Sequence, residues 1–553
     1  MTDIVEALRT ALEEIAAELH REGELERPLP VGENDFVIPR ERQRGDLATP
    51  VLLKAPSRRP RPELAVLFGE RLRARALPFL QSISVAGGGY LNFLLTPSAL
   101  ADNLRQCLNN PDQLVPPAET RLKVRVEFVS ANPTGPLTIA HGRQAAFGEA
   151  LARILSACGH EVKREYYLND EGRQIDLLGE SLRVRVLNLL GDARPLPEDG
   201  YQGEYLVDLA RGLVAERGES LKLETGEFFR DRASSEILQE IRSDLASFGV
   251  IFDSYRSQKE ITARGEVGET LERLKKAGLV YESEGALFLK TMPYGDDKDR
   301  VLVKSDGSYT YLAPDLAYHR LKYAEGDQLM VNLWGPDHFG YITRLQAGLA
   351  GLGCDPQKLK IIIVQLTTLY RDGEKVKMST RQGEFLPLSL LTRELGADVT
   401  KFFFLSRKAS SHLDFDLEQA KKNSAENPVF YLQYASARIA SLFRHQEEKM
   451  PGADLSETGD LLERLGEPEE RELMLRLGQY GSAVAMAGRN LEPQLLLAYL
   501  MNLVKIFHQY YQRCQIIGID PDLSRARLLL VRGLEKVLKQ GLHLLNIRAP
   551  ERM

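Results

Sequence analysis

The sequence predicts an α/β protein with a parallel sheet at its centre and a bundle of helices at its C-terminal end. A strand–helix–strand succession follows residue 123, and strand patterns disappear after about residue 427. Because consecutive strands joined by a helix usually lie parallel, the first pattern predicts a Rossmann-type core with crossover helices. At 553 residues the chain is also too long for one hydrophobic core, so several domains are expected.

The first domain is expected over residues 1–115. It mixes helical stretches with a strand-like close at residues 84–95, and it ends in a turn-rich segment with the composition of a linker. These patterns predict an N-terminal α+β domain.

The second domain is expected over residues 116–426 and holds the parallel sheet. A helix is expected at residues 141–155, and a charged helical insertion at about residues 195–284. The strands are expected at residues 123–129, 161–168, 286–289, 328–333 and 359–366.

The third domain is expected over residues 427–553. Long amphipathic patterns without strand signals predict an all-α helix bundle there. Its clearest helices are expected at residues 473–491, 495–514 and 524–545.

Composition excludes several classes of protein. No run of about 18 apolar residues occurs, so no membrane partner is expected. The first twenty residues have a helical period with acidic side chains, which suits neither a secretory signal nor a transit peptide, and we expect a cytoplasmic location. The four cysteines, Cys107, Cys158, Cys354 and Cys514, form no C-x-x-C pair, so neither a zinc site nor a disulfide framework is expected.

Charge is unevenly distributed along the chain. The net charge is −6, yet residues 40–75 carry ten Lys and Arg against four Asp and Glu, and residues 501–553 carry nine against four. Two basic ends are suited to contact RNA phosphates at two places. For either end alone, a solvated basic helix face is an equally good interpretation.

One segment carries the strongest chemical signal. Residues 126–143 read VEFVSANPTGPLTIAHGR and join a strand to a helix through a Pro/Gly turn. Backbone N–H groups at a helix start favour phosphate, and Gly142 would let a flat base approach the main chain, so an ATP site is expected. The alternative is a sharp turn whose Asn, Pro and Gly serve only its geometry.

This segment resembles the signature of the class I aminoacyl-tRNA synthetases, and specifically that of the bacterial arginyl-tRNA synthetases, S-x-N-P-T-G-P-L-H-x-G-H-G-R. The matching residues are Ser130, Asn132 to Leu137, His141, Gly142 and Arg143. Thr138 and Ala140 stand where the family has histidine and glycine. A threonine can still donate a hydrogen bond to phosphate, although it lacks a histidine's possible charge.

Further stretches resemble the same family in collinear order. Residues 375–381, KVKMSTR, resemble its K-M-S-K-S loop, with Thr380 replacing the second lysine. The remaining resemblances are to its arginine-pocket motif, its W-G-x-D-H-x-G-Y-I motif, the start of its anticodon-binding domain and its C-terminal ending, at residues 310–319, 334–342, 426–438 and 547–553. The N-terminal segment resembles the family's additional domain, which touches the outer corner of tRNA.

The resemblance implies a function: attachment of L-arginine to tRNA(Arg) through an arginyl-adenylate. The catalytic residues acting on the phosphates would be His141, Thr138 and Lys377. The implied ATP site consists of Pro133, Gly135, Thr138, His141, Gly142, Lys377, Met378 and Ser379. Mg²⁺ is expected to be held mainly through ATP, without a metal site made by the protein itself.

The implied arginine site consists of Glu127, Asn132, Tyr311, Asp315 and His338. A guanidinium needs planar, paired acceptors, so the carboxylates of Asp315 and Glu127 are its natural partners. We expect the protein to act as a monomer.

Two other interpretations stay open. A catalytically weakened tRNA-binding paralogue is motivated by Thr138, Ala140 and Thr380, although the other signature residues speak against it. The other is a class I synthetase for another amino acid; the acid-lined pocket and the absence of zinc-type cysteines disfavour cysteine or glutamate specificity.

Overall fold

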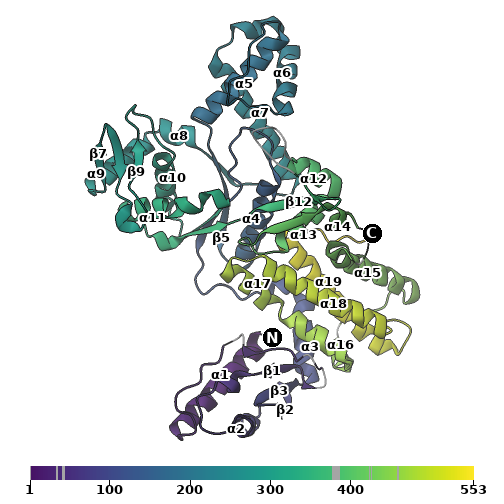
Figure 1. The fold of residues 1–553 in the computed structure, drawn as a ribbon. Helices are drawn as coiled ribbons and strands as arrows, with labels where there is room; N and C mark the ends of the chain where they lie inside the picture. Colours follow the sequence, from purple (N-terminus) through teal and green to yellow (C-terminus); the bar gives the residue numbers. More distant parts are fainter. Residues whose placement is uncertain are drawn as a thin grey trace.

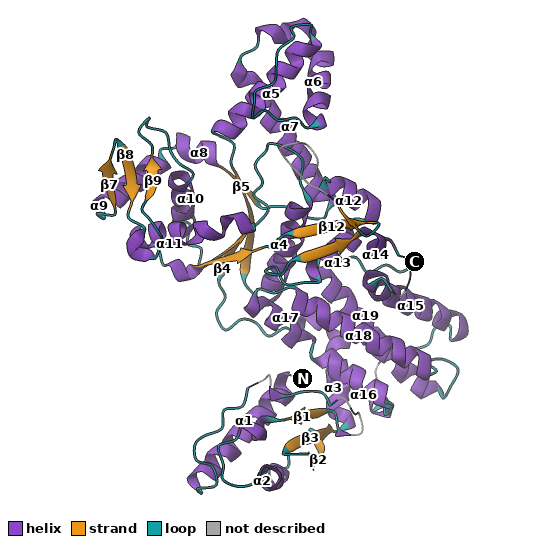
Figure 2. Cartoon of the chain, in the orientation of Figure 1, coloured by secondary structure: helices purple, strands orange, loops and turns teal. Residues whose placement is uncertain are grey.

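The computed structural model describes residues 2–32, 35–39, 41, 44–376, 386–422, 424, 426–456 and 460–553. A central parallel sheet lies between an N-terminal domain at one end and three projecting helices, α5 to α7, at the other, while the C-terminal helices pack along its side (Figure 1). Strands occur in the N-terminal domain and in the core, whereas the C-terminal domain is helical (Figure 2). The predicted fold class is confirmed.

The N-terminal domain combines a three-stranded antiparallel sheet with two helices. The strands lie in the order β1 (Leu47–Thr49), β3 (Tyr90–Leu95) and β2 (Leu80–Ala86), and the helices are α1 (Thr2–Arg21) and α2 (Arg61–Ala74). The predicted strand-like close therefore contains a hairpin. Its turn includes Gly87 and Gly89, whose positive φ angles of 56° and 124° suit residues without a side chain.

Helix α3 (Pro97–Asn109) leads from this domain to the core. Its N-cap, Thr96, accepts a hydrogen bond from the backbone N–H of Ala99 at 3.3 Å, which satisfies one of the free donors of the first turn. The helix buries Leu100 and Leu104.

The core sheet has five parallel strands. Their order is β11 (Leu359–Ile363), β10 (Leu329–Trp334), β4 (Lys123–Glu127), β5 (Glu161–Leu168) and β6 (Ser254–Ser257). The chain starts at β4, builds outward to β6 and returns to β10 on the other side of β4. The point between β4 and β10 is where open α/β sheets bind ligands, at the carboxyl ends of the strands.

The segment expected to be a helical insertion differs in two respects. The projecting helices begin earlier, with α5 (Arg173–Leu189), followed by α6 (Glu204–Arg217) and α7 (Gly226–Ser247). The expected range also contains β6, an edge strand of the main sheet. All four residues of β6 are half-buried, so its sequence shows neither an apolar run nor an alternation.

Several smaller elements complete the core. Antiparallel strands β7 (Val280–Ser283), β8 (Ala286–Leu289) and β9 (Arg300–Val303) form one small sheet, and β13 (Glu374–Lys375), β12 (Thr367–Arg371) and β14 (Leu413–Asp416) form another. The helices are α4 (Ile139–Ala157), α8 (Gln258–Ala263), α9 (Glu266–Lys276), α10 (Leu312–Ala324), α11 (Ile342–Gly351), α12 (Leu388–Leu395), α13 (Ala397–Leu405) and α14 (Leu417–Lys421).

The C-terminal domain is a bundle of helices. They are α15 (Pro428–Lys449), α16 (Pro468–Gly478), α17 (Tyr480–Asn490), α18 (Gln494–Arg513) and α19 (Pro521–Leu544). The stretch expected as one helix at residues 473–491 is therefore two. The break lies where Gly481 meets the backbone of Leu114, whose carbonyl oxygen would be 1.6 Å from an added Cβ. Close packing against the preceding part of the chain thus accompanies the interruption.

Candidate active site at the carboxyl end of the sheet

The predicted site residues gather where the strand order reverses. Glu127 ends β4, and its neighbours in register are Asn332 on β10 and Glu165 on β5. Helix α4 begins beyond a turn after β4, while α10 covers this row of polar side chains and contributes Tyr318 and Lys322 to it.

The turn after β4 has an unusual backbone. Val129 and Ser130 have positive φ angles of 68° and 39°, a conformation that side chains rarely adopt and that concentrates at functional sites. The hydroxyl of Tyr166 donates to the carbonyl of Ala131 at 2.7 Å, and that of Tyr205, on α6, donates to the carbonyl of Thr134 at 2.6 Å. Sequence reasoning missed Tyr205, whose contact links the projecting helices to the signature turn.

The start of α4 presents an uncharged polar surface. Thr138 is the N-cap, and its backbone N–H donates to Nδ1 of His141 at 3.2 Å, which leaves the proton of a neutral ring on Nε2. Burial lowers the pKa of His141 to about 4, against an opposing influence of Asp337. His141 is therefore a neutral hydrogen-bond donor at physiological pH.

The glycines and proline of the signature serve packing. A Cβ on Gly142 would lie 2.5 Å from Leu388 and 3.1 Å from Phe404, so the missing side chain makes room for α12 and α13. Packing against these two helices is therefore a second explanation for glycine at position 142, beside the expected approach of a base. Gly135 would meet the ring of Tyr205 at 3.3 Å, and Pro133 is buried.

Arg143, the last signature residue, is fully buried and ties separate segments together. Its guanidinium donates to the carbonyls of Gln365, Lys408 and Ser411, each at 2.9 Å. Burial lowers the pKa of Arg143 to about 10. This residue holds the loop after β11 and the segment before β14 against α4.

Asp315 lies in the first turn of α10 with its side chain 16% exposed. Its Oδ1 is 3.1 Å from Nδ1 of His319, the only ion-pair partner that the described residues offer it within 4 Å. Burial is the largest influence and would raise the pKa of Asp315, but His319, Tyr341 and Lys322 together outweigh it and the net shift is downward. Tyr311, four residues earlier, is 62% exposed at the N-cap.

Glu127 is held differently. Its Oε2 accepts from the ammonium group of Lys322 and lies 3.0 Å from the hydroxyl of Tyr318, while its Oε1 accepts from Ser130 at 3.3 Å. The carboxylate is 5% exposed. Of the two predicted guanidinium partners, Glu127 therefore forms an ion pair with Lys322, whereas Asp315 has no Lys or Arg within 4 Å among the described residues.

Tyr167 and Tyr341 are two buried tyrosines influenced by the acidic groups. Burial first, and then the charges of Asp315 and Glu127, raise the pKa of Tyr167 well above its usual value. Burial and Asp315 have the same effect on the pKa of Tyr341. Sequence reasoning did not single out either tyrosine.

The remaining predicted residues are either partly exposed at the edge of the site or outside the described residues. Asn132 donates to Oε1 of Gln174 at 2.7 Å, and the His338 side chain is 55% exposed, with its ring centroid 6.4 Å from that of Tyr341. Lys377, Met378 and Ser379 lie outside the described residues, as do Thr380 and Arg381; the description stops at Val376.

Among the described residues, no group of three His, Cys, Asp or Glu side chains could hold a metal ion. None of the described helices carries an apolar stretch sufficient to span a lipid bilayer.

Comparison with known proteins first defines the class. The catalytic domain of class I tRNA synthetases (R) matches residues 103–402, preceded by the arginyl tRNA synthetase N terminal domain at residues 2–95 and followed by the DALR anticodon binding domain at residues 432–553. The arginyl-tRNA synthetase of Thermus thermophilus superposes with a TM-score of 0.73 at 23% identity, covering 99% of this chain and 100% of that one. The sheet and its signature turn are those of a class I aminoacyl-tRNA synthetase.

Sequence relatives identify the branch of that class. The arginine–tRNA ligase of Desulfosudis oleivorans is 44% identical over 528 residues, which cover 94% of this chain and 95% of the relative. That of Syntrophotalea carbinolica is 45% identical over 480 residues, covering 85% and 86%. The chain belongs to the arginyl-tRNA synthetase family.

Proposed function

We propose that this protein is an arginine–tRNA ligase, which activates L-arginine with ATP and transfers it to tRNA(Arg). The substrate assignment rests on a difference in ion pairing between the two carboxylates of the site, Glu127 and Asp315. Glu127 is neutralised by Lys322, whereas Asp315 lies beside it without a Lys or Arg within 4 Å among the described residues. A shielded carboxylate without a cationic partner is a binding site for one.

The guanidinium of arginine would pair with Asp315. The side chain is little exposed, so the attraction is screened less than on an open surface. Glu127 would contribute from the end of β4, and Asn132 would hold the α-amino or carboxylate group of the substrate. Tyr311 and His338, both at the rim, would contact the same substrate.

The phosphates of ATP would bind at the start of α4. Backbone N–H groups of the first turn and the Nε2–H of His141 are donors suited to them, and the hydroxyl of Thr138 lies beside them, 3.3 Å from Nδ1 of His141. In the first step the arginine carboxylate attacks the α-phosphorus and pyrophosphate leaves. Lys377 would neutralise charge on the leaving group, as a cation placed at developing charge does. Mg²⁺ would arrive with ATP and stabilise the charge of its phosphates.

The second step forms the product. The terminal 2′-hydroxyl of tRNA attacks the carbonyl carbon of the adenylate, an ester bond forms and AMP leaves. Neither step requires a covalent bond to the protein, so positioning and charge stabilisation carry the catalysis.

The C-terminal domain would bind the anticodon side of tRNA. On α15, Arg438 lies over the rings of Tyr434 and Tyr511, each at 4.6 Å, and Tyr434 is 38% exposed. Exposed aromatic rings next to a guanidinium suit the stacking of unpaired bases.

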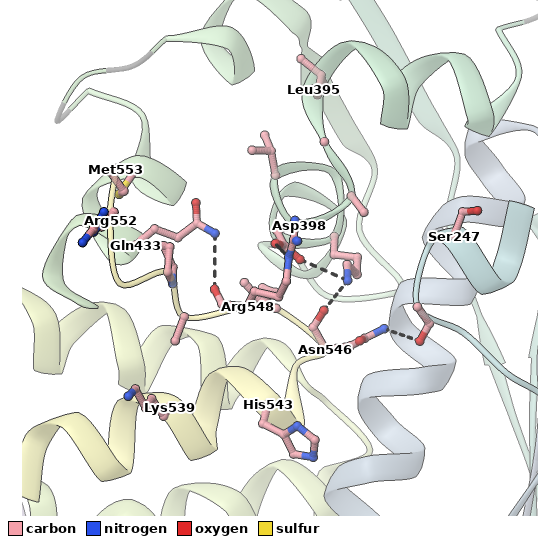
Figure 3. Close-up of a pocket in the computed structure, with 18 of the residues that line it drawn as sticks. Ser247, Leu395, Asp398, Gln433, Lys539, His543, Asn546, Arg548, Arg552 and Met553 are labelled. Atoms are coloured by element: carbon pink, nitrogen blue, oxygen red, sulfur yellow. Dashed lines mark hydrogen bonds and ion pairs between the residues drawn. The ribbon is translucent and has the colours of Figure 1, made fainter. Parts of the chain in front are cut away.

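A basic cavity of about 1000 Å³ lies nearby, between the C-terminal segment, α19 and α13. Figure 3 shows Lys539 and Arg552 at this cavity, together with Arg548, which pairs with Asp398 at 2.6 Å. Lys539 and Arg552 are suited to contact RNA phosphates. We expect a monomeric cytoplasmic enzyme, and light scattering would measure its mass in solution.

Pyrophosphate exchange into ATP tests the proposal. We expect exchange with arginine and with none of the other standard amino acids, and we expect it to require tRNA, as in this family. Exchange with another amino acid would reassign the substrate. Absence of exchange with every amino acid, with tRNA binding retained, would favour the weakened paralogue.

A further inference from the structure

A row of polar side chains crosses the sheet beneath the proposed arginine site. Neighbouring strands place Glu165, Glu127 and Asn332 side by side at the carboxyl end of the sheet. All three are at most 5% exposed, and α10 covers them. Buried polar groups cost free energy unless each is hydrogen-bonded, so the partners of this row are informative.

Helix α10 supplies these partners from one face. Asp315, Tyr318, His319 and Lys322 have the spacing i, i+3, i+4 and i+7, which places them on the side of the helix that meets the sheet. An apolar stripe is the usual composition of such a face. Here it carries one acid, one base and two rings with polar atoms.

The ammonium group of Lys322 fixes the direction of the hydrogen bonds from Lys322 through Asn332 to His319. The ammonium group of Lys322 can only donate, and it lies 3.3 Å from Oδ1 of Asn332, so the amide nitrogen of Asn332 faces the other way. That nitrogen is 2.9 Å from Nε2 of His319 and must donate to it. The proton of the neutral ring is therefore on Nδ1, which lies 2.9 Å from the carbonyl and 3.1 Å from the carboxylate of Asp315.

We propose that Lys322, Asn332 and His319 are positioning residues for Asp315, with Glu127 anchoring the far end of the chain through its ion pair with Lys322. This proposal rests on the proposed function, because it assigns Asp315 to the guanidinium. The chain orients the neutral ring so that its Nδ1–H lies between the backbone carbonyl and the carboxylate of Asp315. The carboxylate is thereby held in place while its negative charge stays available for the substrate.

A purely structural network is the competing explanation. In that case the same contacts only attach α10 to the sheet, and breaking them lowers stability and affects all substrates alike. A positioning role instead changes the KM for arginine and leaves the KM for ATP unchanged, since ATP binds at α4.

The test uses the full-length protein with tRNA, and it reverses one hydrogen bond of the chain. In Asn332→Asp, the new carboxylate can only accept, so His319 must place a proton on Nε2. His319 then either loses its donor toward Asp315 or becomes charged and competes with the guanidinium. We expect the KM for arginine in pyrophosphate exchange to rise about tenfold or more, with kcat and the KM for ATP nearly unchanged.

A second pair of variants keeps the proposal testable if Asn332→Asp folds poorly. His319→Gln keeps one donor and one acceptor and should stay close to the wild type, whereas His319→Leu should raise the KM for arginine as Asn332→Asp does. Thr270→Val is the control for attachment of α10, because it removes a buried contact from Arg320, at 2.9 Å, on the helix's other side. It should lower the melting temperature without changing either KM.

The outcomes are distinguishable. If the wild type shows no arginine-dependent exchange, the proposed function fails and the assignment falls with it. If Asp315→Asn is impaired but Asn332→Asp and His319→Leu keep the wild-type KM for arginine, the positioning role is overturned and the function stands. A parallel rise of both KM values in these variants, or failure of His319→Gln to rescue, would assign the network to structure alone.

Discussion

The two ends of the site differ in the charge of their polar groups. At the α10 end, charged groups lie buried within the sheet and are cross-paired: Lys322 with Glu127, and Arg125 with Asp327 at 2.6 Å. At the α4 end, the described polar groups that would face ATP are the neutral His141, the hydroxyl of Thr138 and backbone N–H groups.

The difference corresponds to what each end has to recognise. A guanidinium is a fixed cation, so a preorganised carboxylate can select it before any reaction begins. Phosphates gain charge on the leaving group as the reaction proceeds, and only interactions that strengthen in the transition state accelerate it. We therefore expect the positive charge for that step to come from residues 375–381 and the neutral donors of α4 to hold ATP.

Lys377→Ala gives the largest expected effect on this comparison. Loss of one preorganised charge contact should lower the rate of adenylate formation by about 10²–10³-fold while arginine binding survives. Single-turnover activation would measure it, with Lys360→Ala, an exposed lysine on β11, as the control. A wild-type rate in Lys377→Ala would move the role to Lys375 or Arg381.

Gly142→Ala tests how the α4 end is built. The added Cβ would clash with the buried Leu388, so unfolding free energy should fall by about 1–3 kcal/mol. Gly268→Ala, on α9 and in open space, is the matched control and should be neutral or stabilising. A rise in the KM for ATP without loss of stability would instead support the expected approach of a base to Gly142.

Charge reversal at the basic cavity tests whether tRNA binds there, away from the α4 and α10 ends of the active site. Lys539→Glu combined with Arg552→Glu should weaken tRNA binding by roughly tenfold and make its salt dependence shallower, because fewer counterions are released. Filter binding across a salt series would measure both quantities, with Lys275→Glu on α9 as the control. Lys539 pairs with Glu535 at 2.9 Å, and Arg525, another basic residue of the C-terminal domain, likewise donates from its Nε to the carbonyl of Asp454 at 2.9 Å. An unchanged affinity and salt slope would direct tRNA to another face.

The neutral state of His141 makes a prediction about pH. Its folded pKa, about 4, lies below the usual value of 6.5, so the unfolded chain binds more protons in between and acidification from pH 6.5 toward 4 destabilises the fold. His141→Gln has no imidazole to protonate, so its unfolding free energy should fall less than that of the wild type over this pH range. For a half-buried ring, the difference should be on the order of 1 kcal/mol. Parallel stability curves for the two proteins would show that His141 is not held neutral.

Local patterns were sufficient to predict much of the fold. The strand predicted at residues 161–168 is β5, and the predicted helix at residues 141–155 lies within α4. Both contain fully buried residues, and α4 is buried on nearly every side. The edge strand β6 has no fully buried residue, and its place depends on pairing with β5, which the local sequence does not encode.

The charges were harder to predict, because ion pairs join residues far apart in sequence. The excess of positive charge at residues 40–75 is partly used internally: Arg59 pairs with Glu24, Arg71 with Glu22 and Arg75 with Glu18. In the same way the pairing of Glu127 with Lys322 spans 195 positions. A signal for it did exist, since polar residues repeat with helical spacing from Asp315 to Lys322.

The central claim is that the charge of Asp315 selects arginine, and Asp315→Asn tests it most directly. Removing one partner of a shielded charge pair costs on the order of 2–5 kcal/mol. The kcat/KM for arginine should therefore fall by a factor between about 30 and several thousand, while the KM for ATP stays unchanged. The measurement compares arginine with citrulline, its neutral analogue, as ligands of wild type and variant. We expect the wild type to prefer arginine strongly and Asp315→Asn to lose most of this preference; an unchanged preference with an unchanged kcat/KM would show that the charge of Asp315 does not select arginine.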